Sequence, residues 1–557
     1  MIRDLDSLAD RTFDVVVIGG GIFGACSAWE ASLRGFSVAL IEKHDFSHAT
    51  SANHFKMVHC GIRYLQHADL RRLRESSRER SALLRIAPHL VHTLPIVIPT
   101  YGHGVKGKAF LGSGMLLYDA LTVDRNRGLL PAKKIRPSRF LSAAEVIRRF
   151  PGIRRQGLTG AAVFEEGQMY NPPRLVLSFI HAAAAKGAVC ANYVRATGFL
   201  KRGRRVFGVT ATDELGGNTL EIRGRLVLNT AGPWAHRIME PGLGLRLRPR
   251  PTFSRDLAFV VNRRFESTAG LALATDTKDA DTLVDRGGRH LFAVPWREFT
   301  LIGVWHKVWH GPPETLTVSQ AELSGYVREV NRAYPGLLLS EKEILMVNMG
   351  LTLFGQESHQ AAGQISFGHR SQVIDHARAH GVEGLLTLIG VRATTARGMA
   401  AAAVDRIQQR LGWKQRDVDS TRVPIYGGDF DSFEELVARA RKSAPLDIDD
   451  QMARCLCRNY GSQWAKVLAL ADQVPLKPPA IDGSHVLQCE VLHAVRHEMA
   501  RKLSDVVLRR TDLGSGKMPS RRAVSTCAAL MADELGWNGR KVQNEIADLR
   551  RSYPAWA

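Results

Sequence analysis

The sequence predicts an α/β fold, α+β overall, that ends in a helical domain. A short apolar, β-branched run at Asp14–Ile18 leads directly into a glycine-rich turn and a helical pattern, which is typical of a parallel-sheet unit. Residues 255–303 read as an antiparallel sheet, with a hairpin at Leu291–Gly303. From Asp429 onward the periodicity is helical. Because 557 residues are too many for one hydrophobic core, we expect several domains.

The glycine-rich turn carries the spacing G-x-G-x-x-G. The first glycine permits a tight turn, the second lets the backbone approach a pyrophosphate, and the third lets the helix pack on the strand. The helix that follows directs its N-terminus at the phosphates. We therefore expect a dinucleotide to contact Gly19, Gly21, Ile22, Phe23 and Gly24. The alternative is a glycine-rich loop in an ordinary α/β protein.

An acidic residue closes the second strand of this unit. Gly35 ends the helix, Val38–Ile41 is the strand, and Glu42 stands at its tip, followed by Lys43. A carboxylate at this place accepts hydrogen bonds from a ribose diol and repels a 2′-phosphate. The sequence therefore favours FAD or NAD over NADP, with Glu42 and Lys43 at the cofactor.

Composition and charge limit the remaining function classes. Apolar residues make up 45% of the chain and charged residues 23%, which is ordinary for a globular protein. The seven cysteines show no paired metal spacing, so we expect no metal site and a reducing compartment. The charged N-terminus and the absence of a long apolar run predict a cytoplasmic protein, or one on the inner face of the cell membrane.

The net charge of +22 is spread along the chain rather than gathered in one tail. No zinc knuckle or aromatic RNA-binding motif accompanies it, so we expect no nucleic-acid partner. Attraction to anionic lipid head groups or to an acidic small-molecule substrate fits this pattern better.

Residues 42–74 carry the first family resemblance. The segment resembles the stretch ATSSxSSKLIHGGLRYLE of the FAD-dependent glycerol-3-phosphate dehydrogenase family, within the D-amino-acid-oxidase-like flavoproteins. The matching residues are Ala49, Thr50, Ser51, Lys56, His59, Gly61, Arg63, Tyr64 and Leu65. His54, Phe55 and Cys60 depart, because the family has two serines and a glycine there. The resemblance implies that Thr50, Ser51, Lys56 and His59 lie beside the flavin.

A second cofactor segment follows a buried strand at Arg225–Leu228. The run Asn229–Ala235 (NTAGPWA) resembles the same superfamily, and its small residues let the strand end approach the dinucleotide. It implies cofactor contacts at Ala231, Gly232 and Trp234. An NAD-dependent dehydrogenase has no reason to return to its cofactor about 200 residues later, so FAD is favoured over NAD.

The third segment, Leu385–Val404, is a strand, a glycine and an alanine-rich helix. It resembles the family's GGKLTTYRxLAE, with Arg392 where the family has lysine. The helix would direct its positive end at the flavin pyrimidine. The implied cofactor residues are Gly390, Arg392, Thr394 and Thr395.

The resemblance covers nearly the whole chain and implies its organisation. The FAD-binding domain would comprise residues 1–95, 176–250 and 351–427. The substrate domain would comprise 96–175 and 251–350, and a C-terminal helical domain 428–557. Family members act as peripheral membrane proteins or as soluble oxidases, so quinone or oxygen is the implied electron acceptor. A homodimer is also open.

The resemblance breaks where the family has its substrate pocket. A family histidine is Ala258 here, a family phosphate-binding arginine is Thr352, and a second family arginine aligns with Arg370. The family also ends one strand with Thr-Thr-Asp, where this chain has Val304-Trp305-His306. Losing a guanidinium removes roughly 1.5–3 kcal/mol of charge-assisted binding unless another arginine compensates. A glycerol 3-phosphate oxidation with an altered pocket is the leading hypothesis.

The implied chemistry moves a hydride from a carbinol C–H to flavin N5 while a base takes the hydroxyl proton. His59 is our candidate base, since an imidazole suits proton transfer near neutrality. The other expected catalytic-site residues are Arg63, Tyr64, Arg370 and Arg392, with His306 and His369 in reserve.

Three alternatives stay open. One is a flavin oxidase or dehydrogenase for another hydroxy or amino compound, which Ala258 and Thr352 favour. Another is a flavin-bearing binding protein without turnover. The third concerns the cofactor, because His54 or Cys60 would allow a covalent flavin link.

Overall fold

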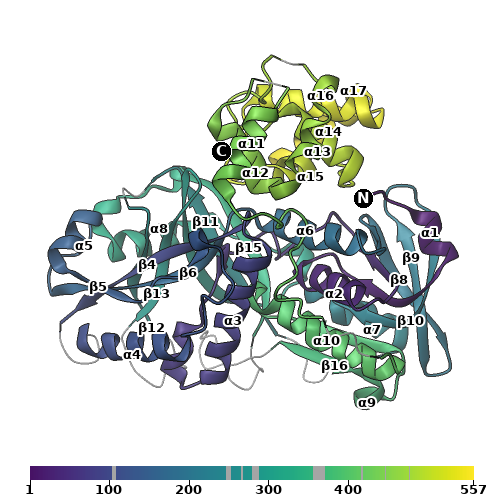
Figure 1. Cartoon of the computed structure of the whole chain (residues 1–557), viewed down its shortest axis with the longest axis horizontal. Coiled ribbons are helices and arrows are strands. Elements are labelled where there is room, and N and C mark those ends of the chain that lie inside the picture. The colour runs from purple at the N-terminus through teal and green to yellow at the C-terminus, as the bar shows by residue number, and fades with distance from the viewer. Residues whose placement is uncertain are drawn as a thin grey trace.

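The computed structural model describes residues 1–102, 108–245, 252–264, 267–278, 288–354, 371–414, 418–445, 447–475 and 477–556. Two large sheets lie beside each other, and a helical unit formed by the C-terminal part of the chain covers one side of them (Figure 1). The predicted α/β class with a helical C-terminal part is confirmed. Within the described residues, no helix is both long and apolar enough to cross a membrane.

The first sheet, sheet A, is built around the predicted glycine-rich unit. Its order is β16 (Gln372–Asp375), β17 (Leu385–Ile389), β10 (Thr219–Asn229), β1 (Thr12–Ile18), β2 (Val38–Ile41) and β7 (Val189–Ala191). The strands from β17 to β7 run parallel, and β8 (Val194–Arg202) and β9 (Arg205–Asp213) add an antiparallel extension to β10. Both strands expected at Asp14–Ile18 and Val38–Ile41 are therefore present.

Helices pack on sheet A as its apolar pattern requires. α2 (Ile22–Leu33) contacts both α6 (Pro172–Ala184) and α10 (Ala396–Leu411), and the three share one core with β1 and β2. α7 (Ala235–Leu243) lies against β8 of the extension, and α1 (Leu5–Asp10) contacts β10 and β7 (Figure 1).

The second sheet, sheet B, is almost wholly antiparallel. Its order is β15 (Ile344–Phe354), β11 (Thr252–Val261), β14 (Phe299–Trp309), β13 (Gly288–Trp296), β12 (Gly270–Lys278), β4 (Val91–Tyr101), β6 (Leu158–Met169) and β3 (Met57–Val58), with β5 (Arg139–Ser142) on β6. The expected hairpin is β13–β14, and its turn holds Arg297 at φ 56°. Among the described strands of sheet B, only β4 and β12 pair in parallel.

Side chains alternate across sheet B, so its two faces have different coverings. Leu257 and Phe259 pack under α8 (Gln320–Ala333) and α5 (Ala143–Arg149). α5 starts with the expected capping box of Ser142 and Glu145. Ala258 belongs to the opposite face, which α3 (Leu70–Ile86) and α4 (Lys108–Leu121) approach.

The helical unit comprises α11 (Phe433–Ser443), α12 (Asp450–Tyr460), α13 (Trp464–Leu468), α14 (Gln488–His497), α15 (Leu503–Asp505), a π-helical turn at Val506–Arg510, α16 (Arg521–Leu535) and α17 (Gly539–Arg550). Cys455 and Cys457 are both buried on α12. The six-segment domain division stays a proposal. Two of the proposed boundaries, 95/96 and 350/351, fall inside strands of sheet B, because β4 spans Val91–Tyr101 and β15 spans Ile344–Phe354.

A buried ion-pair network joins the helical unit to sheet A. Asp45, in the segment after β2, accepts hydrogen bonds from Arg509 Nε at 2.7 Å and from Arg510 Nη2 at 2.6 Å. Arg174 on α6 donates to Glu498 Oε1 at 2.6 Å. All five side chains are at most 7% exposed. Removing one partner from such a pair leaves an uncompensated buried charge.

Asp45→Asn should therefore destabilise the fold by about 3–5 kcal/mol, because Arg509 and Arg510 would lose their shared carboxylate. The measurement is urea unfolding followed by tryptophan fluorescence. The control is Glu534→Gln, which breaks the partly exposed pair with Arg496 and should cost about 1 kcal/mol or less. Equal losses in both variants would contradict this role of Asp45.

Candidate functional site

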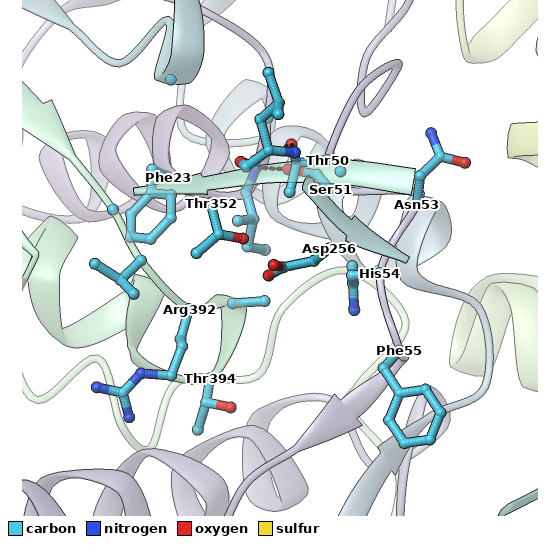
Figure 2. A pocket seen from close by; sticks show the side chains of 18 of the residues that line it. Phe23, Thr50, Ser51, Asn53, His54, Phe55, Asp256, Thr352, Arg392 and Thr394 are labelled. Atoms are coloured by element: carbon cyan, nitrogen blue, oxygen red, sulfur yellow. Dashed lines mark hydrogen bonds between the residues drawn. The ribbon is translucent and has the colours of Figure 1, made fainter. Parts of the chain in front are cut away.

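A cavity of about 1130 Å³ lies between the two sheets. Its lining includes residues at the carboxyl ends of β1 and β2, the segment 48–55, the start of α3, and residues of β11, β13, β14 and β15 (Figure 2). In open parallel sheets, ligands bind at the carboxyl ends of the strands. Sheet A therefore offers a cofactor site at the place predicted from the glycine-rich turn.

Two glycines of the turn, Gly19 and Gly24, lie where a side chain would not fit. Gly19 has φ +105°, which disfavours any residue with a Cβ. A Cβ on Gly24 would lie 1.8 Å from the carbonyl oxygen of Gly19 and 2.7 Å from Thr230 Oγ1. Gly24 thus lets α2 pack against β1 and β10, although it does not itself line the cavity.

The N-terminus of α2 faces the cavity through Gly21 and Ile22. The Ile22 amide donates to Ser51 Oγ at 2.9 Å, which ties the segment 48–55 to the helix start. Amides and the helix dipole at this position suit a phosphate group.

Glu42 lines the same end of the cavity. Its carboxylate accepts from the amides of Gly20 at 2.7 Å and His44 at 2.9 Å, so its direction is fixed. Burial raises the pKa of Glu42, although these two amides counter the shift. Nearby, the Lys43 ammonium lies 4.0 Å from the centre of the Trp234 ring, and the Trp234 indole donates to Glu314.

The segment 48–55 is also fastened to sheet B. Thr50 Oγ1 accepts from the Leu351 amide at 3.0 Å and donates to the Leu351 carbonyl at 3.1 Å (Figure 2). This pair of bonds places the segment next to Thr352, which lines the cavity. One segment therefore contacts the expected cofactor end and the substrate-side sheet together.

His54 and Asn348 line the cavity, and each has a buried polar atom without a hydrogen-bond partner within the described part of the chain, His54 Nε2 and Asn348 Nδ2. His54 Nδ1 accepts from the Lys56 amide at 2.9 Å, and burial lowers the pKa of His54 to about 3. The ring is therefore neutral near pH 7 and carries its proton on Nε2. Asn348 Oδ1 accepts from Lys56 Nζ at 3.1 Å, which leaves the amide nitrogen of Asn348 as a buried donor. Buried donors of this kind fit a ligand with acceptor atoms, as a flavin has.

The third predicted segment reaches the cavity in part. A Cβ on Gly390 would lie 1.8 Å from the ring of Phe23, so glycine there admits the phenylalanine. Thr394 Oγ1 accepts from the His59 amide at 3.0 Å, which joins two predicted segments. Thr395 is buried away from the cavity and donates to the Arg392 carbonyl.

Arginines gather around Tyr64 at one part of the lining. The guanidinium carbon of Arg392 lies 4.9 Å from the centre of the Tyr64 ring, and that of Arg72 lies 5.8 Å from it. Arg72 also pairs with Asp69 at 3.2 Å, and Arg63 lines the same cavity. This arginine cluster (Arg63, Arg72 and Arg392) can hold an anionic group.

His59 lies on the cavity wall with its side chain 49% exposed. Its Nδ1 is 3.7 Å from Glu166 Oε1, beyond hydrogen-bond distance. Glu166 instead accepts from the Cys60 amide at 2.6 Å. Burial raises the pKa of the Cys60 thiol, which does not line the cavity, so a covalent flavin link through Cys60 gains no support.

Sheet B brings an acid and an imidazole into the cavity. Asp256 on β11 and His306 on β14 are direct cross-strand partners, and Asp256 Oδ1 is 2.7 Å from His306 Nδ1. Ser254 Oγ donates to the same oxygen at 2.6 Å. Ala258 also lines the cavity, beside a wall of Val304, Phe292, Val294, Ile96 and Phe164.

Most of the predicted site residues line this one cavity: Gly19, Gly21, Ile22, Phe23, Glu42, Lys43, Thr50, Ser51, His59, Arg63, Tyr64, Ala231, Gly232, Trp234, Gly390, Arg392 and Thr394. Gly24, Lys56 and Thr395 do not line it. Lys56 turns into the protein, 4.7 Å from the centre of the Trp296 ring, and burial lowers its pKa to about 7. Arg370 and His369 lie outside the described residues.

The sequence did not single out Arg72, Asn348 or Asp256 as site residues. Arg72 lies in the first turn of α3, beyond Leu65, which is the last residue that matches the family segment. The other two depend on strand register, which no local pattern gives.

Comparison with known proteins agrees with this geometry. Residues 14–406 match a family model described as FAD dependent oxidoreductase, and residues 418–542 match the C-terminal domain of alpha-glycerophosphate oxidase. A glycerol-3-phosphate dehydrogenase of Synechocystis sp. is 28% identical over 98% of this chain and 97% of its own length. Glycerol-3-phosphate dehydrogenase 2 of Mycobacterium tuberculosis is 29% identical over 97% of this chain and 88% of its own length.

Among solved structures, the glycerol-3-phosphate dehydrogenase of Bacillus halodurans complexed with FAD shares the fold. The TM-score is 0.76 at 21% identity, covering 98% of this chain and 96% of the other. An L-alpha-glycerophosphate oxidase of Mycoplasma pneumoniae, with FAD bound, gives a TM-score of 0.52 at 15% identity over 74% of this chain and 99% of its own.

Gly24→Ala should abolish tight FAD binding, because the added methyl must displace α2 from the turn at Gly19. The ratio of flavin to protein absorbance in the purified protein measures this. Gly325→Ala on α8 is the control, since the nearest atom to its Cβ is 3.9 Å away. A fully loaded Gly24→Ala protein would contradict the role given to this glycine.

Proposed function

The chain belongs to the FAD-dependent oxidoreductase family, and from this premise we propose that it oxidises a carbinol carbon of a small anionic polyol of the glycerol 3-phosphate type. The start of α2 with Gly19 and Gly21 would hold the diphosphate, and Glu42 a ribose hydroxyl. His54, Asn348 and Thr394 line the part expected to hold the flavin ring. FAD, when bound, supplies a two-electron acceptor for a hydride.

The proposal of an anionic substrate rests on the arginine cluster around Tyr64. Thr352 stands where the family resemblance predicts a phosphate-binding arginine, so that position supplies no cation. Arg392 and Arg72 flank Tyr64 in the same cavity, and Arg63 lines it too. Guanidinium groups bind phosphate through charge-assisted hydrogen bonds, so this cluster supplies the anion site from other positions. The names of the relatives supply glycerol 3-phosphate as the substrate to test.

A second candidate is a larger carbinol or an amino compound. The apolar wall of Val304, Phe292 and Val294 favours it, because a three-carbon polyol leaves such surface uncovered. A binding protein without turnover has no comparable observation in its favour.

The electron acceptor and the cellular setting are further parts of the proposal. We propose quinone or oxygen as the acceptor, a cytoplasmic location and contact with an anionic membrane surface. The net charge of +22 supports the contact, as do Leu116 and Leu117 on α4, which are 67% and 51% exposed. A homodimer remains a proposal from the family resemblance.

Anaerobic addition of glycerol 3-phosphate to the holoenzyme should bleach the flavin absorbance band in the visible range, since hydride transfer consumes the oxidised flavin. Stopped-flow absorbance measures the rate at micromolar to millimolar substrate. Bleaching by dithionite but not by glycerol 3-phosphate would reject this substrate and leave an intact flavoprotein for the larger carbinols.

Arg392→Gln should raise KM for glycerol 3-phosphate by about tenfold to a hundredfold, because it removes one charge-assisted contact worth roughly 1.5–3 kcal/mol. Steady-state kinetics at fixed ionic strength measure the change. Arg71→Gln is the control, as Arg71 is an exposed arginine on α3 that does not line the cavity. Similar KM values for both variants would remove Arg392 from the anion site.

A further inference from the structure

We propose that Asp256 and His306 together receive the proton of the substrate hydroxyl, so that this pair, rather than His59, is the acid–base group of the site. The inference rests on the proposed carbinol oxidation and deepens it. It names the residues that act on the hydroxyl, whereas the arginine cluster acts on the anionic group.

The pair is held by the two strands that carry it. β11 and β14 are inner strands of sheet B, and Asp256 and His306 face each other directly in their register. The side chains are 22% and 15% exposed, so both are partly shielded from water. Figure 2 shows the Asp256 carboxylate pointing into the cavity. Groups fixed by central strands keep a defined geometry, which proton transfer requires.

The residue before Asp256 on β11 faces the other side of sheet B, away from the cavity. Arg255 points to the opposite face, where it pairs with Glu322 at 2.8 Å and donates to the Thr317 carbonyl. Directly after Asp256, the pairing of β11 with β14 shifts register between Leu257 and Ala258. Such irregularities re-aim side chains and are frequent beside active sites.

A carboxylate–imidazole pair stands out on this wall, because Ala258, Val304 and Phe292 line the cavity around it. Burying such groups costs solvation free energy unless they are hydrogen-bonded. The pair and Ser254 meet part of this demand, and a substrate hydroxyl group would add a further hydrogen bond.

Two of the departures from the family resemblance also meet here. Asp256 lies two residues before Ala258, which stands in place of the family histidine, and His306 ends the segment that replaces Thr-Thr-Asp. They are far apart in the sequence, but the strands bring them within 2.7 Å. The two altered segments therefore each lack family residues, but together they contribute one hydrogen-bonded pair.

The chemistry balances with the pair as proton acceptor. The carbinol C–H bond would break with its electron pair, and FAD, when bound, would accept the hydrogen and that pair as hydride. The O–H bond breaks, its electrons form the C=O bond, and its proton passes to the Asp256–His306 pair. A carboxylate bonded to Nδ1 orients an imidazole and stabilises its protonated form. The two groups share the proton, so the acceptor is the pair rather than one atom.

His59 is less suited to this task. Its side chain is half-exposed, and its nearest carboxylate oxygen, on Glu166, is 3.7 Å away. The backbone amide of His59 donates a hydrogen bond to Thr394 Oγ1, which gives His59 a structural role between two cofactor segments.

The test is anaerobic stopped-flow reduction of the holoenzymes of Asp256→Asn, His306→Asn and His59→Asn. The substrates are glycerol 3-phosphate, glycerol and 1,2-octanediol. Asp256→Asn and His306→Asn should lower the limiting reduction rate by about 10²–10⁴-fold. His59→Asn should change it less than tenfold. Lys307→Gln, the next residue on β14, pairs with Glu322 on the opposite face and serves as the matched control.

Two measurements separate a lost base from a damaged site. Calorimetry of glycerol 3-phosphate binding to the dithionite-reduced holoenzyme, in which oxidation cannot proceed, should show less than a tenfold change in Kd for Asp256→Asn. The FAD content should equal that of the unaltered protein. Ser254→Ala removes one hydrogen bond to Asp256 and should slow reduction only about fivefold, so it tests the pair even if Asp256→Asn fails to fold.

Each outcome decides the proposal. Reduction of Asp256→Asn and His306→Asn at near-normal rates, or a large loss in His59→Asn alone, overturns it. Suppose that glycerol 3-phosphate does not reduce the flavin but glycerol or 1,2-octanediol does, and that Asp256→Asn and His306→Asn slow this reduction by the same factor. The role of the pair then stands, and glycerol 3-phosphate is rejected as the substrate. If dithionite reduces the unaltered holoenzyme but no carbinol does, both the role of the pair and the proposed carbinol oxidation are rejected.

Discussion

The close approach of three backbone segments at Gly19 is the constraint on which the rest of the site depends. Thr230 Oγ1 donates to the Ile18 carbonyl at 2.7 Å and also contacts the Gly19 carbonyl at 3.1 Å, which fixes β10 against the end of β1. Gly24 brings α2 into the same contact. The start of α2 then faces the cavity, and the Gly20 amide meets Glu42. A larger residue at these glycines would separate the helix from both strands, and the cofactor end of the cavity would be lost with it.

The segment 48–55 links this junction to the substrate side of the cavity. Ser51 binds the first turn of α2, and Thr50 binds β15 of sheet B. The segment 48–55 thus couples the position of sheet B to the position of the glycine-rich turn. Because the residues on β11, β14 and β15 have fixed register, their cavity-facing side chains are placed relative to the cofactor end without any flexible intermediary.

The sequence predicted the parts of the site that depend on local chemistry. The strand, turn, helix and acid at Asp14–Glu42 are contiguous, so periodicity and glycine spacing were enough. Lys56 shows the limit of such reasoning. Its backbone has φ +59°, and the chain turns so that His54 faces the cavity while Lys56 faces Asn348 and Trp296. The Asp256–His306 contact was also beyond reach, since it depends on the pairing of strands about 50 residues apart and on a register shift between them.

The cavity therefore presents two different polar regions within largely apolar walls. The arginine cluster at Tyr64 favours negative charge, whereas the Asp256–His306 pair repels an anion and accepts a hydrogen bond. A substrate that satisfies both must carry an anionic group and a hydroxyl group on one small skeleton. A simple alcohol brings no anion to the arginines, and an anion without a hydroxyl group brings no proton to the Asp256–His306 pair. Because each of these ligands would make one polar interaction fewer, two-point recognition would give selectivity from the residues proposed to direct the chemistry.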